Sequence, residues 1–155
     1  MPLVETKYFG TMDYADESVF DFPGGLPAFE EEKRFVFIEM PEYAPLVFLQ
    51  SLRQASLCFL ALPVSVVDPE YHLVVSAEDR AALALEQEPN APEEILTLAL
   101  LSLHDGFSAT ANLMAPIVVN VRNRRALQAI RTDRTYSHQH PLQRTDTVPL
   151  CEGTC

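Results

Sequence analysis

The stretch Thr110-Ala111-Asn112-Leu113-Met114-Ala115-Pro116-Ile117-Val118-Val119-Asn120 runs from a polar start into a β-branched segment. β-Branched residues favour strands, and Pro116 stands near the start of Ala115–Val121, where a strand tolerates a missing N–H donor. The side-chain amide of Asn112 can satisfy backbone groups of the preceding loop. The stretch therefore predicts a loop that becomes a buried strand at Pro116.

The rest of the chain repeats this pattern of short runs between turns. Twelve prolines and five glycines interrupt its 155 residues, which favours short strands over long helices. Period-two alternation and apolar runs predict strands in the following segments: Glu5–Phe9, Ser18–Phe22, Phe35–Glu39, Leu46–Gln50, Ser56–Leu62, Tyr71–Val75, Ile95–Leu103, Ala115–Val121 and Leu127–Ile130.

One segment is helical by pattern. Ser76 can cap a helix whose first turn holds Glu78 and Asp79, which favours a helix near Ala77–Glu86. About eight to ten short strands and one helix predict a mostly β fold. We expect a small antiparallel barrel or sandwich with the helix over one opening.

Composition and charge restrict the environment and the partners. Hydrophobic residues make up 48% of the chain, yet no apolar run approaches the roughly 20 residues of a membrane helix. The start of the chain has no signal-peptide pattern, so we expect a cytoplasmic protein without a membrane partner. Net charge is −11, and residues 1–105 alone carry −14. This acidic body repels phosphates, which argues against direct nucleic-acid binding. The arginines of residues 122–144 are interpreted as a solvated edge rather than a basic patch.

Neither a catalytic constellation nor a convincing metal site is present in the sequence. Cys58 lies in an apolar run and is expected to be a buried core thiol. The pair Cys151 and Cys155, like His138 and His140, supplies too few ligands for a closed structural site. Glu30-Glu31-Glu32 lacks the spacing of a calcium loop and is expected to be solvated. We therefore expect no enzyme activity, no cofactor and no metal.

The loop after the second predicted strand is unusually apolar. It holds Phe22, Leu26, Pro27 and Phe29 around Pro23-Gly24-Gly25. Loops normally carry polar side chains, so these groups either tuck under the loop or form a surface for a partner. The residues alone leave both interpretations open.

Four segments, in order, resemble the FliW family of flagellar assembly factors. They are residues 5–10 (ETKYFG), 22–30 (FPGGLPAFE), 48–51 (FLQS) and 110–120 (TANLMAPIVVN). The resemblance covers about residues 4–142, with His140-Pro141-Leu142 near its end. It implies a single domain over residues 1–142 and a tail, expected to be flexible, over residues 143–155. Ala28 replaces a family glycine, which suggests that this position does not need a positive φ, and Ala126 replaces another.

The resemblance implies a pseudo-barrel capped by one α-helix and a regulatory function. Family members bind flagellin and also CsrA, the RNA-binding regulator that represses translation of flagellin mRNA. The implied activity is relief of that repression, reversed by flagellin, with a flagellin chaperone lacking CsrA antagonism as the alternative. A small barrel enzyme or metal-binding barrel is the alternative from another class. The candidate partner-binding residues are Phe22, Pro23, Gly24, Leu26, Pro27, Phe29, Gln50, Asn112 and Pro116.

Overall fold

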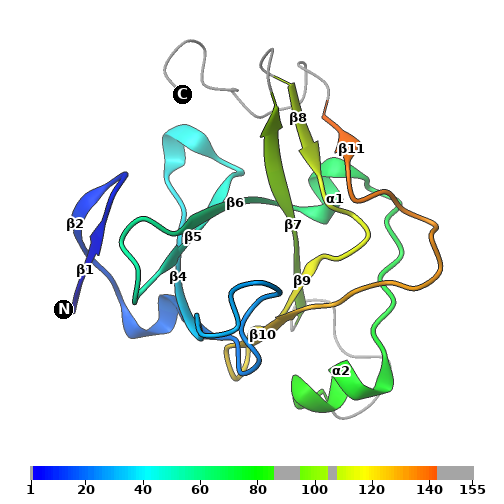
Figure 1. The fold of residues 1–155 in the computed structure, drawn as a ribbon, viewed down its shortest axis with the longest axis horizontal. Helices are drawn as coiled ribbons and strands as arrows, with labels where there is room; N and C mark the ends of the chain where they lie inside the picture. The colour runs from blue at the N-terminus through cyan, green and yellow to red at the C-terminus, as the bar shows by residue number, and fades with distance from the viewer. Residues whose placement is uncertain (1, 86–94, 105–107, 143–155) are drawn as a thin grey trace.

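The computed structural model describes residues 2–85, 95–104 and 108–142 (Figure 1). Within these ranges the chain forms short strands, two α-helices and two 3₁₀ turns. The strands are β1 (Leu3–Thr6), β2 (Gly10–Asp13), β3 (Val19–Asp21), β4 (Arg34–Ile38), β5 (Val47–Ser51), β6 (Cys58–Pro63), β7 (Ile95–His104), β8 (Ser108–Ala111), β9 (Ile117–Asn120), β10 (Arg125–Gln128) and β11 (His140–Pro141). The helices are α1 (Val64–Val67) and α2 (Ala77–Ala82), and the 3₁₀ turns are η1 (Asp16–Ser18) and η2 (Pro41–Tyr43).

Seven strands close into a barrel, which Figure 1 shows from one end. Strands β3, β4, β5, β6 and β7 pair as neighbours in chain order, and β9 then joins β7 to β10. These pairings are antiparallel. The barrel is closed by a parallel contact between β10 and β3, with Arg125 opposite Asp21. The mostly β, antiparallel pseudo-barrel expected from the sequence is thus confirmed.

The barrel interior is filled by alternate residues of its strands. Phe35, Leu49, Leu98 and Ile117 are fully buried there. Burying side chains of this size contributes roughly 1.5–3 kcal/mol each. Strand pairing and this core therefore support each other, because alternate residues of each strand point to one face.

Strand β7 belongs to two sheets, which explains its apolar character on both faces. Its first half pairs with β9 and its second half pairs with β8. Leu98 packs inside the barrel, whereas Ala99 packs with Ala111 and Leu113 in a second cluster. β11 extends that side of the sheet by pairing with β8. Both faces of β7 are therefore covered at Leu98 and Ala99, whereas Leu103 near its end is 58% exposed.

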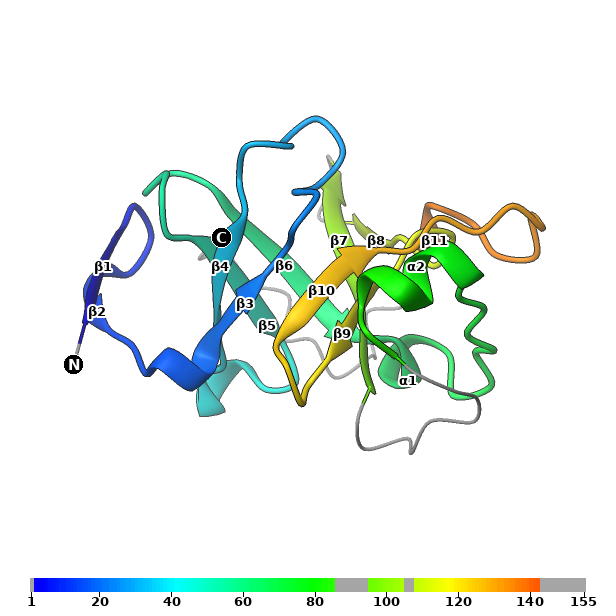
Figure 2. The same cartoon turned by 90° about the horizontal axis from the view of Figure 1, so that it is seen from below.

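The predicted helix is present as α2, the longest helix of the described residues. Its N-cap forms as expected, since the Asp79 N–H donates to Ser76 Oγ at 3.0 Å. Its C-terminal end is held by Asn120, whose Nδ2 donates to the Leu83 carbonyl at 2.9 Å. Leu83 packs against Val118, whereas the neighbouring Val119 faces the barrel interior. The helix thus covers the outer wall of the barrel at β9, as Figure 2 also shows. Glu86, the predicted helix end, lies outside the described residues.

The prediction of a strand at Tyr71–Val75 is wrong. This segment forms no ladder and is held by side chains instead. The Tyr71 hydroxyl donates to the Leu113 carbonyl at 2.7 Å. The buried Arg131 lies against the Tyr71 and Tyr136 rings, at 5.5 and 4.8 Å from their centroids. Cation–π contacts of this kind hold the segment without a neighbouring strand.

Strands β2, β8 and β11 are present in the structure in addition to the strands that the sequence predicts.

Two further expectations concern the cysteines. Cys58, expected to be a buried core thiol, is half-buried on β6. Its partial burial raises the thiol pKa to about 11, so the group stays protonated at neutral pH. Cys151 and Cys155 lie outside the described residues.

Asn112 shapes the connection between β8 and β9 in the way the sequence suggests. The backbone N–H groups of Met114 and Ala115 donate to its Oδ1 at 3.1 and 3.0 Å. Pro116, which follows, is buried and has no N–H to satisfy. The amide side chain therefore replaces the backbone partners that this turn lacks.

We predict that Asn112→Ala lowers the free energy of unfolding by about 1–3 kcal/mol, because two part-buried N–H donors lose their acceptor. Asn112→Asp is the matched control, since it keeps an acceptor oxygen at the same position and should lose less. Urea unfolding of both variants measures the difference. Full stability of Asn112→Ala together with loss of partner binding would contradict this structural role.

Candidate partner-binding surface

In the loop between β3 and β4, some apolar residues are buried and others are exposed, so each of the two interpretations holds for part of the loop. Phe22 and Leu26 are buried in the barrel core, at 0% and 2% exposure. Pro23, Pro27 and Phe29 are exposed. Phe22 closes the base of the loop, because its N–H donates to the Lys33 carbonyl at 2.7 Å. The loop therefore tucks two apolar side chains inward and presents the others to solvent.

Two positions of this loop have a left-handed backbone. Gly25 has φ +67°, and a Cβ added there would lie 2.5 Å from the Glu30 carbonyl oxygen. Ala28 has φ 71°. The expectation that Ala28 does not need a positive φ is therefore wrong. The loop imposes this conformation even on alanine, whose Cβ makes it cost roughly 1–2 kcal/mol.

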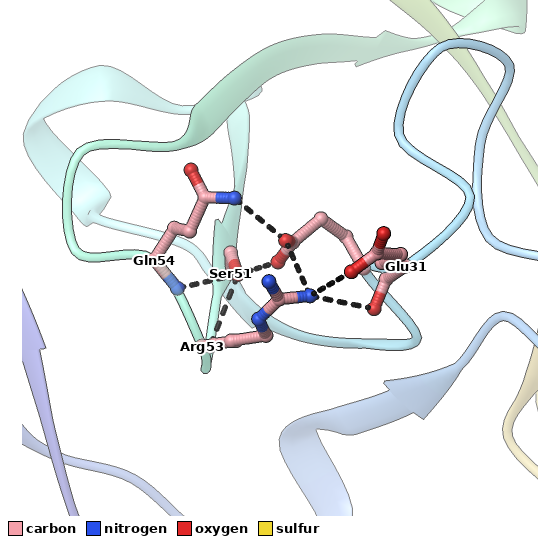
Figure 3. A network of polar contacts seen from close by, with 5 residues as sticks. Glu31, Ser51, Arg53 and Gln54 are labelled. Atoms are coloured by element: carbon pink, nitrogen blue, oxygen red, sulfur yellow. Dashed lines mark hydrogen bonds and ion pairs between the residues drawn. The ribbon is translucent and has the colours of Figure 1, made fainter.

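A buried carboxylate ties the loop to the turn between β5 and β6 (Figure 3). Glu32 is only 2% exposed. The Ser51 hydroxyl donates to its Oε1 at 2.6 Å, and Gln54 Nε2 donates to its Oε2 at 2.7 Å. Arg53 Nη1 lies 3.4 Å from the same Oε2 and 3.2 Å from Glu31 Oε1. Two segments far apart in the chain are thus joined by one side chain.

This finding corrects the expectation that the three consecutive glutamates form a solvated face. Glu30 and Glu31 are exposed, but Glu32 is buried. No local pattern marks Glu32 as buried, because its partners come from a separate turn. A buried charge of this kind needs the hydrogen bonds that Ser51 and Gln54 donate.

Gln50 acts on the same turn from the inside. It is fully buried on β5, and its Nε2 donates to the carbonyls of Ser51, Gln54 and Ala55 at 3.0–3.2 Å. Its side chain therefore shapes the β5–β6 turn from beneath the surface. Any influence of Gln50 on a partner acts through the turn.

The remaining predicted site residues lie in two places. Gly24 is exposed at the tip of the β3–β4 loop. Asn112 and Pro116 belong to the connection between β8 and β9, well away from that loop in Figure 1. The structure therefore groups the loop residues with the β5–β6 turn and leaves Asn112 and Pro116 apart.

A surface hollow lies where the loop meets the turn. Its volume is about 230 Å³, and it is lined by Ala28, Phe29, Glu30, Glu31, Glu32, Arg53 and Gln54. Phe29 is 38% exposed and packs its ring edge-on against Phe59, with centroids 5.5 Å apart. We call the exposed residues Pro23, Gly24, Pro27, Phe29 and Arg53 the loop face. An aromatic ring and an arginine beside exposed apolar groups are the composition of protein-binding surfaces.

Among the described residues, no group of three or more His, Cys, Asp or Glu side chains is placed to hold a metal ion. In the same part of the chain, no helix combines the length and the apolar character needed to cross a membrane. The fold and the loop face together define a small β-barrel that exposes an aromatic ring, two prolines and an arginine.

Comparisons with known proteins agree with this class. The model of the family described as FliW protein matches residues 3–142. The flagellar assembly factor FliW of Desulfitobacterium hafniense (strain Y51) is 40% identical over 140 residues, covering 90% of each chain. That of Syntrophomonas wolfei is 34% identical over 143 residues, covering 92% of this chain and 88% of the relative. That of Bacillus subtilis is 33% identical over 141 residues, covering 90% and 96%.

A crystal structure of the flagellar assembly factor FliW superimposes with a TM-score of 0.80 and 29% identity, covering 90% of this chain and 96% of that one. This chain belongs to the FliW family of flagellar assembly factors.

We predict that Glu32→Ala lowers the free energy of unfolding by about 1–3 kcal/mol, because the Ser51 and Gln54 donors lose a buried acceptor. Glu31→Ala is the control, since Glu31 is exposed and its change should stay within about 0.5 kcal/mol. Urea unfolding measures both. Equal stability of the two variants would show that the buried carboxylate does not hold the loop.

Two glycines in left-handed conformations separate the energetic cost of backbone strain from the cost of a steric clash. Gly10 has φ +69° with nothing within 4 Å of an added Cβ, so Gly10→Ala should cost about 1–2 kcal/mol from the left-handed backbone alone. Gly25→Ala adds a clash with the Glu30 backbone and should cost about 2–5 kcal/mol in total. Thermal unfolding of the two variants tests this. A loss for Gly25→Ala no larger than that for Gly10→Ala would contradict it.

Proposed function

We propose that this protein is a cytoplasmic regulator of flagellin synthesis that binds flagellin and antagonises the translational regulator CsrA. In this proposal the free protein keeps CsrA from repressing flagellin mRNA, and flagellin reverses the effect by occupying the protein. The observation that carries the proposal is membership of the FliW family over residues 3–142, which includes the loop face. The proposal requires no catalysis and no cofactor.

The charge of the chain supports a basic partner. The net charge is −11, and an acidic protein is attracted to a basic one and repelled by nucleic-acid phosphate. CsrA needs a basic surface where it binds RNA. An acidic body bound beside that surface adds repulsion against phosphate, and the protein itself is not expected to contact RNA.

The loop face supports the binding of a protein. Its apolar groups are already exposed in the free protein, and the turn and Glu32 hold the loop in place. A partner would therefore meet a formed surface, with Phe29 as the aromatic anchor and Arg53 as the neighbouring charge.

The proposal is tested by a titration of purified components. CsrA bound to labelled flagellin leader RNA is expected to be released by this protein, and added flagellin should restore the RNA complex. By linkage, CsrA should weaken flagellin binding by the factor by which flagellin weakens CsrA binding. Low ionic strength should speed association with CsrA, because salt screens the attraction.

Controls separate flagellin binding from CsrA antagonism. The protein alone should not shift the leader RNA at physiological salt. If the CsrA–RNA complex stays intact at concentrations at which the protein binds flagellin, CsrA antagonism is excluded and a simple flagellin chaperone takes its place.

A further inference from the structure

A second hollow lies at the end of β3 opposite to the β3–β4 loop. Figure 2 shows that η1 leads into β3 at one end and that the β3–β4 loop leaves it at the other. The residues that line the two hollows place one hollow at each of these ends. The volume of this groove is about 460 Å³, twice that of the hollow at the loop face. It is lined by residues of β2 and η1 and of the segment between them, by residues of β3 and β4, and by Leu96 of β7.

The floor of the groove is apolar and partly open to solvent. Phe37 stacks on Phe20 with ring centroids 4.2 Å apart. Phe37, Leu96, Met12 and Tyr14 are only half-buried. Binding pockets have volumes of about 300–1,000 Å³, so this groove has room for the side chains of a short peptide segment. Covering its floor would remove apolar surface from water.

The rim of the groove is acidic. Asp13, Glu17 and Glu39 are exposed around the floor. In the part of the chain that the structure describes, none of the three forms an ion pair. Arg124 approaches this end of the barrel, but its Nη1 donates to the Asp16 carbonyl at 3.3 Å, and it does not line the groove. The three carboxylates are therefore available to a positively charged group.

The loop face differs from this groove in charge. Arg53 lies within 3.4 Å of the carboxylates of Glu31 and Glu32, so acidic groups there already have a cation. The groove has an apolar floor and three carboxylates without such a cation. Its complementary ligand is a peptide segment with an apolar side chain and Lys or Arg residues beside it.

We propose that this groove binds a basic segment of a protein partner, with an apolar side chain of that segment on the Phe37 and Leu96 floor. The inference rests on the proposed function for the identity of the partner, which is the RNA-binding regulator. It adds that the basic partner docks at the η1 end of β3, at a surface distinct from the loop face. The two binding sites then do not overlap, so direct overlap does not prevent both partners from binding at once.

The location is tested directly by NMR on the ¹⁵N-labelled full chain with unlabelled CsrA. The largest amide shift changes are expected at residues 12–18 and 36–39. Changes concentrated at residues 23–31 and 53–54 instead would overturn the inference. If CsrA causes no shift changes at all, the proposed antagonism of CsrA fails. This result differs from shift changes at the loop face, which would overturn only the location of the site.

Matched charge variants supply the second arm. The triple variant Asp13→Asn, Glu17→Gln, Glu39→Gln should weaken CsrA binding by about tenfold or more at low salt. The control Glu5→Gln, Glu70→Gln, Glu78→Gln changes net charge by the same amount at exposed sites outside the groove and should stay within about threefold. Equal losses for the two triples would show that only net charge matters and would overturn the inference.

A variant that fills the groove gives an uncharged test. Ala15→Trp places a large side chain at a lining position and should weaken CsrA binding while leaving net charge unchanged. Thermal unfolding and the ¹⁵N spectrum of each variant report whether it is folded. A folded Ala15→Trp protein that binds CsrA as the parent does would contradict docking on the groove floor.

Discussion

The barrel depends on a very short closing contact. Strands β3 and β10 meet with one residue pair, Arg125 opposite Asp21, and the Asp21 N–H donates to the Arg124 carbonyl at 2.8 Å. Arg124 reaches this position in a left-handed conformation, with φ 60°. The other barrel neighbours share between three and four residue pairs. Because the closing ladder is so short, closure rests on the interior packing of Phe22, Phe35 and Ala126 at least as much as on hydrogen bonds.

Much of this fold could be predicted from local sequence, because most of its strands pair with neighbours in the chain. The β3–β6 meander and β9 follow alternating or β-branched runs, and Ser76 caps α2 as its position suggests. No local pattern predicts β8 and β11, because both are too short to show a clear alternation, although β8 pairs with the adjacent β7. Tyr71–Val75 was misassigned because its apolar residues pack beside side chains rather than in a ladder. Closure itself joins residues about a hundred positions apart, which no local pattern reports.

The candidate surface could be predicted only in part. The Pro-Gly-rich loop was identified, but the division between buried Phe22 and exposed Phe29 depends on the tertiary position of the loop. Neither the burial of Glu32 nor the groove beside η1 has a local sequence signal, since each depends on segments that are distant in the chain. With the two hollows at the two ends of β3, mutual exclusion of two partners would have to come from their bulk or from a change transmitted through the barrel. Either route is compatible with reciprocal linkage.

The buried Glu32 has a consequence for the thermodynamics of association. A loop that orders only when its partner arrives loses conformational entropy at that moment, and the affinity falls accordingly. Here the β3–β4 loop is already fixed at its base by Phe22 and at its side by Glu32, Ser51 and Gln54. Association at the loop face would therefore carry little backbone ordering cost, and its heat-capacity change should reflect buried surface rather than coupled folding. Preorganisation of this kind favours tight binding through a small contact area.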